Sequence, residues 1–130
     1  MTPIWGLTEG GNKRAAGRPR VPPRGVVYGP DLSFRLSVSV AASSGTNVMA
    51  HCVEALYAPD ADPISSLLAK EGLRLLAAGL PTSVAATSTR TAHADVLLGA
   101  CLAGWAPAAA GTALHHKICH ILGRLVRFRW

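Results

Sequence analysis

Two pairs of polar side chains, each spaced four residues apart, are the groups in this sequence that could carry out chemistry. Asn47 and His51 form the first pair, and His116 and His120 form the second. Residues four apart on a helix lie on one face, so two such pairs on neighbouring helices could converge on a shared site. Histidine suits proton transfer and metal binding because its ring titrates near neutral pH and its neutral form binds metal ions. Histidine pairs without carboxylate or cysteine ligands are more often surface or core residues, so the spacing alone defines only a candidate site.

The other residues of reactive type are expected to be structural. Glu54 follows His51 by three residues and could either orient that ring or be solvated. His93 stands alone in the sequence and is expected at the surface. The cysteines form no CxxC pair and are expected to be buried, reduced thiols, because free cysteine is among the most buried residue types. They are Cys52, Cys101 and Cys119.

Helices are expected to position the two pairs, since helical periodicity of apolar residues begins at Ser43. Asp62 is the expected cap of a second helix that has Pro63 at its first position. Prolines at Pro81 and Pro107 are expected to end helices. The predicted helical ranges are 43–57, 62–80, 91–105 and 107–122. The expected buried faces of the first two helices comprise Val48, Met49, Cys52, Val53, Leu56, Ile64, Leu67, Leu68, Leu75 and Leu76.

The first 42 residues lack this periodicity and are expected to be extended. A short strand around 4–7 could pair with a second strand at 26–28 in a long β-hairpin. Leu36, Val38 and Val40 alternate with serines, which is also a strand-like pattern. We therefore predict a mainly α fold: an extended or hairpin segment over 1–42, a helical bundle over 43–123 and an aberrant tail over 124–130.

Composition limits the class of protein. The chain has 130 residues, of which 49% are hydrophobic and 15% charged, and this suits one compact domain or part of one. The net charge of +6 is concentrated at the two ends, which argues against a nucleic-acid-binding face. The uncharged stretch 96–114 is long enough to span a bilayer, but it is rich in alanine and glycine and contains Pro107, so buried helices are expected instead. No secretory signal opens the sequence, and a cytoplasmic protein is expected.

Five sequence blocks carry a resemblance to a known family. They read MTPIWGLTE at 1–9, SGTNVMAH at 44–51, VEALYAPD at 53–60, GACLAG at 99–104 and ALHHKICHILG at 113–123. In this order the blocks resemble an internal part of the maleylacetate reductases, within the iron-containing alcohol dehydrogenase superfamily. The resemblance extends over nearly all of residues 1–123.

The resemblance implies an enzyme. Members of this family use NADH or NADPH to reduce the carbon–carbon double bond of maleylacetate to 3-oxoadipate, in the bacterial breakdown of aromatic compounds. They pair an N-terminal dinucleotide-binding α/β domain with a C-terminal helical domain, and the active site lies between the two. The intact enzyme is expected to be a homo-oligomer acting on a small-molecule substrate, without nucleic-acid or membrane partners.

The resemblance also assigns roles to residues. Asn47, His51 and His116 occupy the positions of metal ligands for iron or zinc, and His120 matches a histidine near the nicotinamide. Asparagine at position 47 is typical of maleylacetate reductases, and its neutral amide is a weaker metal ligand than a carboxylate. His51, His116 and His120 are therefore the expected catalytic residues, while Asn47 and Lys117 are expected to bind substrate.

Both ends of the chain depart from the family pattern. The dinucleotide-binding region lies before the part that resembles this chain, and residues 124–130 do not continue the family sequence, which a frameshift would explain. We therefore expect a fragment that is inactive alone. Two alternatives stay open: a fragment of a metal-dependent iron-type alcohol dehydrogenase, and a small basic helical module that binds anionic partners.

Overall fold

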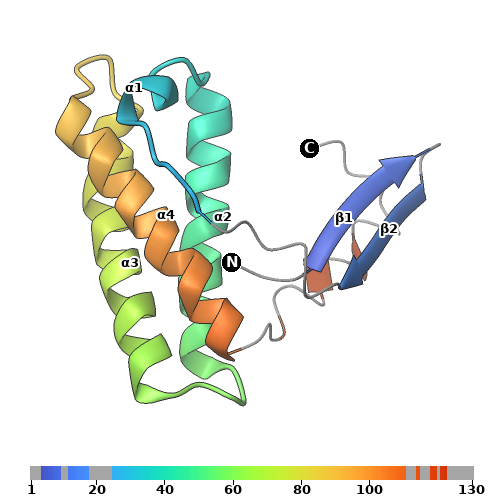
Figure 1. Ribbon diagram of the computed structural model, residues 1–130. Helices are drawn as coiled ribbons and strands as arrows, with labels where there is room; N and C mark the ends of the chain where they lie inside the picture. The colour runs from blue at the N-terminus through green and yellow to red at the C-terminus, as the bar shows by residue number, and fades with distance from the viewer. Residues whose placement is uncertain are drawn as a thin grey trace.

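The fold is a small helical bundle with a separate β-hairpin (Figure 1). The computed structural model describes residues 4–9, 12–17, 25–110, 114, 118–119 and 121–122. Its elements are β1 (Ile4–Glu9), β2 (Asn12–Gly17), α1 (Pro30–Ser33), α2 (Val38–Tyr57), α3 (Pro63–Ser83) and α4 (Arg90–Ala110). The three long helices lie side by side and α1 packs across one end of them, which confirms the mainly α prediction.

Strand β1 pairs with β2 in an antiparallel hairpin, with Ile4 opposite Gly17 and Glu9 opposite Asn12. The predicted second strand at 26–28 is wrong, because residues 25–29 form no strand. Two residues separate β1 from β2, so this pairing closes a much shorter loop than a partner at 26–28 would require.

Helix α2 begins earlier than the sequence predicts. Its cap is Ser37, whose hydroxyl accepts a hydrogen bond from the Val40 amide at 3.3 Å, six residues before the predicted start at Ser43. The strand-like alternation of Leu36, Val38 and Val40 was misleading, because these side chains are exposed and no described strand lies alongside them. The predicted end at Tyr57 is confirmed, immediately before the Ala58-Pro59 pair.

Helix α3 begins as its sequence predicts. The Asp62 carboxylate accepts hydrogen bonds from the amides of Ile64 and Ser65, and the Ser65 hydroxyl accepts one from the Asp62 amide, which completes a capping box. The predicted stop before Pro81 is wrong, because the helix continues to Ser83. Pro81 lies on the exposed side of the last turn, where water can replace the hydrogen bond that proline cannot donate.

Helix α4 runs from Arg90 through Pro107 to Ala110, so the predicted break at Pro107 is also wrong. Alanines flank this proline on both sides, and alanine has the strongest helix propensity of all residues. The predicted helix over 107–122 lies largely outside the described residues. Beyond Ala110, the described residues 114, 118–119 and 121–122 are helical.

Small side chains form the core where the helices meet. The buried cluster contains one large aliphatic residue, Leu76, among cysteine and alanines: Cys52, Ala55, Ala58, Ala69, Ala103 and Ala106. A Cβ added at Gly99 of α4 would lie 3.0 Å from the Gly72 carbonyl oxygen of α3, so these backbones are in close contact.

This close approach decides which faces of the helices are buried. Leu75 and Leu76 are buried as expected, but Ile64 and Leu67 are 70% and 67% exposed, and Val53 is 46% exposed. The glycine and alanine positions, and not the full leucine stripe, therefore define the contact face. Within the described residues, no helix has the length and apolarity needed to cross a bilayer.

Candidate functional site

The first predicted pair lies together on the middle of α2. The side-chain nitrogen of Asn47 is 3.5 Å from Nε2 of His51, one helical turn further on. Asn47 is exposed and His51 is half-buried, so the pair is accessible on the surface of the described bundle. The predicted spacing therefore places both groups on one face.

This pair can act as a proton donor or acceptor. An amide offers both N–H donors and a carbonyl acceptor, and each imidazole nitrogen donates or accepts according to the tautomer. The two ends of the Asn47 amide exchange by a half-turn of the side chain, so Asn47 can hold His51 in either tautomer. The arrangement suits a histidine that hydrogen-bonds and protonates a polar substrate.

The same pair is a poor metal site. Both donors are neutral, whereas the hard or borderline metals of this ligand type favour a carboxylate in the set. Among the described residues, no three histidine, cysteine, aspartate or glutamate side chains converge as metal ligands. His116, the third predicted metal-ligand position, lies outside the described residues, so the metal site stays a prediction.

Two residues that follow His51 on α2, Cys52 and Glu54, are buried in the bundle. Cys52 is fully buried, and burial raises the pKa of its thiol to about 11, so it is not a nucleophile at neutral pH. Glu54 is only 2% exposed, so the expectation that it could be solvated is wrong. The buried-thiol prediction is confirmed for Cys52, while Cys101 and Cys119 are only half-buried.

The second predicted pair lies outside the described residues. His116, Lys117 and His120 are in this group, so their approach to His51 stays a prediction. The described neighbours Leu114 and Ile118 are exposed.

Sequence reasoning missed the more buried of the two histidines, His51 and His93, that the structure describes. His93 was expected at the surface, but it is only 6% exposed. Its Nδ1 lies 2.6 Å from the hydroxyl of Ser33, and its ring centroid lies 3.9 Å from that of Phe34, with the two rings tilted by 34°. Helix α1 covers His93, and nothing in the local sequence of α4 indicates that it does.

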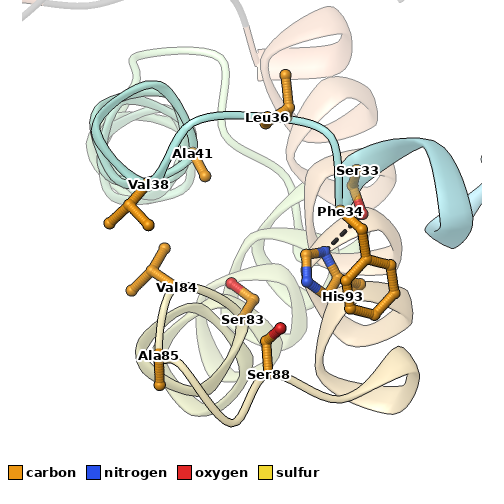
Figure 2. Close-up of a pocket in the computed structure, with 10 residues that line it drawn as sticks. All are labelled: Ser33, Phe34, Leu36, Val38, Ala41, Ser83, Val84, Ala85, Ser88 and His93. Atoms are coloured by element: carbon orange, nitrogen blue, oxygen red, sulfur yellow. Dashed lines mark hydrogen bonds between the residues drawn. The ribbon is translucent and has the colours of Figure 1, made fainter.

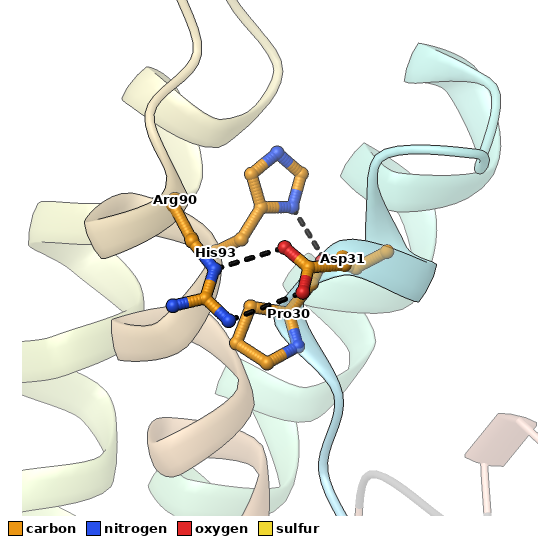
Figure 3. A network of polar contacts seen from close by, with 5 residues as sticks. Pro30, Asp31, Arg90 and His93 are labelled. Carbon is orange, nitrogen blue, oxygen red and sulfur yellow. Dashed lines mark hydrogen bonds and ion pairs between the residues drawn. The ribbon is translucent and has the colours of Figure 1, made fainter.

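An ion pair holds α1 against α4 beside this histidine (Figure 3). Arg90 Nε is 2.9 Å from Asp31 Oδ1, and Arg90 Nη2 is 3.1 Å from Asp31 Oδ2. These hydrogen bonds lower the pKa of the Asp31 carboxyl below its usual value. Both side chains are 71% exposed, so the pair orients α1 more than it stabilises the fold.

Comparisons with known proteins agree with this architecture. Residues 41–127 match the sequence family described as "Fe-containing alcohol dehydrogenase family, C-terminal". The chain is 48% identical over 123 residues to maleylacetate reductase of Sphingobium indicum, and 46% identical to maleylacetate reductase 2 of Cupriavidus pinatubonensis. Each match covers 95% of this chain, and it covers 35% and 34% of the two relatives.

The three-dimensional match is equally extensive. The crystal structure of maleylacetate reductase from Rhizobium sp. strain MTP-10005 superposes with a TM-score of 0.91 at 41% identity. That match covers 98% of this chain and 37% of the other. The chain therefore spans about a third of the length of the curated relatives it matches.

Proposed function

The chain belongs to the Fe-containing alcohol dehydrogenase family, and from that premise we propose that it supplies part of the helical domain of a maleylacetate reductase. The reaction is reduction of the substrate double bond by NADH or NADPH, in the breakdown of aromatic compounds. The observation that carries the proposal is the Asn47–His51 pair on α2, at the positions where the family resemblance puts the polar side of the active site.

The absence of a negative charge on Asn47 favours reduction of an unsaturated acid over metal-dependent alcohol oxidation. Maleylacetate carries carboxylates, and a neutral amide beside a histidine can donate hydrogen bonds to them, whereas an aspartate would repel them. Hydride addition to one carbon of the double bond leaves negative charge that a proton at the other carbon must neutralise. His51 is the described group that could deliver this proton, and His116, His120 and Lys117 are its proposed partners.

The intact enzyme is proposed to be cytoplasmic and homo-oligomeric, as the family resemblance implies. The hydride donor would be bound by the dinucleotide-binding domain of the family. The 130-residue chain on its own is proposed to be inactive, because residues 1–123 resemble only the helical side of the cleft.

A chimaera tests the proposal directly. Residues 1–123 would replace the matched stretch of the Sphingobium indicum maleylacetate reductase, and NADH or NADPH oxidation would be followed at 340 nm with maleylacetate. We expect turnover by the chimaera and none by the isolated chain. His51→Ala should reduce turnover by about 10²–10⁴-fold, the usual contribution of an acid or base group.

The matched control is Val53→Ala, because Val53 lies two residues along the same helix and is 46% exposed. It should leave turnover close to that of the parent chimaera. A folded chimaera that oxidises neither cofactor with maleylacetate would contradict the proposal. So would a His51→Ala variant that retains full activity.

The Asn47→Asp variant distinguishes a maleylacetate reductase from a metal-dependent alcohol dehydrogenase. Turnover of the parent chimaera should be insensitive to a chelator, and the aspartate variant should bind Zn²⁺ more tightly and lose maleylacetate turnover. Chelator-sensitive activity of the Asn47 chimaera towards a simple alcohol would favour the alternative.

A further inference from the structure

A small cavity lies at the end of the bundle where α1, α2, α3 and α4 meet (Figure 2). Its volume is about 110 Å³. The lining residues are mostly apolar, with three serines and one histidine, and none of them is charged: Ser33, Phe34, Leu36, Val38, Ala41, Ser83, Val84, Ala85, Ser88 and His93. Ala41 is the lining residue of α2 nearest to Asn47, which lies six residues further on, about 9 Å along the helix. The cavity is therefore distinct from the Asn47–His51 pair.

One polar atom in this cavity lacks a partner. Nε2 of His93 is buried and makes no hydrogen bond to any described residue. Figure 2 shows this nitrogen on the side of the ring that faces Ser83 and Ser88, away from the bond to Ser33. A buried polar atom without a partner is costly, so its position indicates a hydrogen-bonding ligand.

The contacts of Ser33 decide which kind of hydrogen bond Nε2 can make. The Ser33 hydroxyl donates its only proton to the Pro30 carbonyl at 2.6 Å. Its 2.6 Å contact with His93 Nδ1 must then be donated by the ring, so Nδ1 carries the proton. In the neutral ring Nε2 is therefore an acceptor, and it requires a ligand that donates.

The serines favour a hydroxyl over other donors. The Ser83 hydroxyl donates to the Leu80 carbonyl at 2.9 Å and keeps its lone pairs free to accept. The Ser88 hydroxyl lines the same cavity and, as a hydroxyl, can donate to a ligand oxygen. A hydroxyl group both donates and accepts, and so can satisfy Nε2 and a serine together.

The walls favour an organic molecule over water alone. A water occupies about 30 Å³ in the liquid and needs two to four polar partners, whereas six of the ten residues that line this cavity of about 110 Å³ have apolar side chains. Phe34, Leu36 and Val38 are themselves partly exposed, so the cavity is not sealed from solvent. We propose that this cavity binds a small, neutral, hydroxyl-bearing amphiphile of the alcohol or phenol class, with its hydroxyl on His93 Nε2 and its apolar part against Phe34 and Val38.

Phenol and toluene are the test ligands, because they differ by a hydroxyl in place of a methyl group. Their binding to the 130-residue chain would be measured by saturation-transfer NMR, together with the variants His93→Phe, Ser33→Ala and Ser66→Ala. His93→Phe keeps a ring against Phe34 and removes both nitrogens. We expect it to reduce the phenol-to-toluene affinity ratio by about fivefold, the effect of losing one neutral hydrogen bond.

Ser33→Ala removes the acceptor for Nδ1–H and should lower the same ratio by a smaller factor, because it allows the other tautomer. Ser66→Ala removes a hydroxyl from α3 outside the cavity and should leave the ratio unchanged. The tautomer would be read in the wild-type chain from long-range ¹H–¹⁵N correlations at about pH 8, above the usual titration range of histidine. We expect an unprotonated Nε2.

Three results would overturn the proposal: a protonated Nε2 in the neutral ring, a ratio that stays unchanged in a folded His93→Phe chain, or hydration of the cavity without phenol binding. Circular dichroism of each variant establishes whether it is folded. If His93→Phe does not fold, the wild-type tautomer and the Ser33→Ala ratio still decide the outcome.

Discussion

The contact between α3 and α4 can be tested with one substitution at two glycines of the same helix. Gly99→Ala places a methyl group 2.8 Å from Leu76 Cγ and 3.0 Å from the Gly72 carbonyl oxygen. Leu76 is fully buried and the carbonyl belongs to the α3 backbone, so neither can move aside without shifting the helix. Gly104→Ala places the same methyl group where, apart from the adjoining backbone of α4, no atom of the described residues lies within 4 Å.

The two variants share one favourable contribution. Replacing glycine by alanine inside a helix stabilises it by about 1 kcal/mol. At Gly104 this gain should stand alone. At Gly99 it is opposed by overpacking, which costs about 1–3 kcal/mol, so the net effect is a destabilisation of about 0–2 kcal/mol. The free energies of unfolding of the two variants should therefore differ by about 1–3 kcal/mol.

Urea unfolding of the 130-residue chain, followed by circular dichroism at 222 nm, measures this difference. Thermal unfolding provides a second measurement, with roughly 3–6 °C expected for each kcal/mol at this chain length. Equal stabilisation by both alanines would refute the close approach of α3 and α4 at Gly99. Equal destabilisation would show that α4 is not helical through Gly104.

Two further predictions follow from charges and thiols. Cys52 should react with a thiol reagent at about pH 8 far more slowly in the folded chain than in urea, since burial raises the pKa of its thiol from 9.0 to about 11 and leaves about a hundredfold less thiolate. Its raised pKa also means that its contribution to stability is present below pH 9.0 and is lost as the pH rises towards 11, which pH-dependent unfolding would show. Asp31→Asn should increase hydrogen exchange of α1 amides without changing those of α3, and the wild-type contact should weaken with salt. Because the pKa of Asp31 is lowered, the contribution of the ion pair is present above its usual value of 3.8 and is lost as the pH falls through the lower folded value.

The sequence correctly predicted the helix ends that are set by residues adjacent in the sequence. The Asp62 cap of α3 and the end of α2 before Pro59 are set by adjacent residues, and the residue types predicted both; the part of Ser65 in the capping box was not predicted. The effect of the two prolines inside helices was predicted wrongly, because whether a proline ends a helix depends on its surroundings in the fold. Pro81 is tolerated on an exposed final turn, and Pro107 continues a helix among alanines.

Which face of each helix is buried depends on how closely the helix backbones approach each other. Periodicity assigned Ile64 and Leu67 to the core because both are large and apolar. The actual contact uses Gly72 and Gly99, which carry no side chain and so contribute nothing to an apolar pattern. A helix packed through its smallest residues leaves part of its leucine stripe exposed, and sequence periodicity cannot distinguish this from ordinary burial.

The two described bundle histidines show what residue spacing can and cannot establish about a site. His51 has Asn47 one turn away on the same helix, so a local pattern was sufficient to select it. His93 has its partner Ser33 sixty residues earlier in the chain, and only the packing of α1 on α4 brings them together. In that packing Nδ1 of His93 is bonded to Ser33, and Nε2 has no partner among the described residues and faces the cavity. Spacing therefore predicted the histidine on an open face and assigned the buried one to the surface, although the buried ring has the more narrowly defined hydrogen-bonding chemistry.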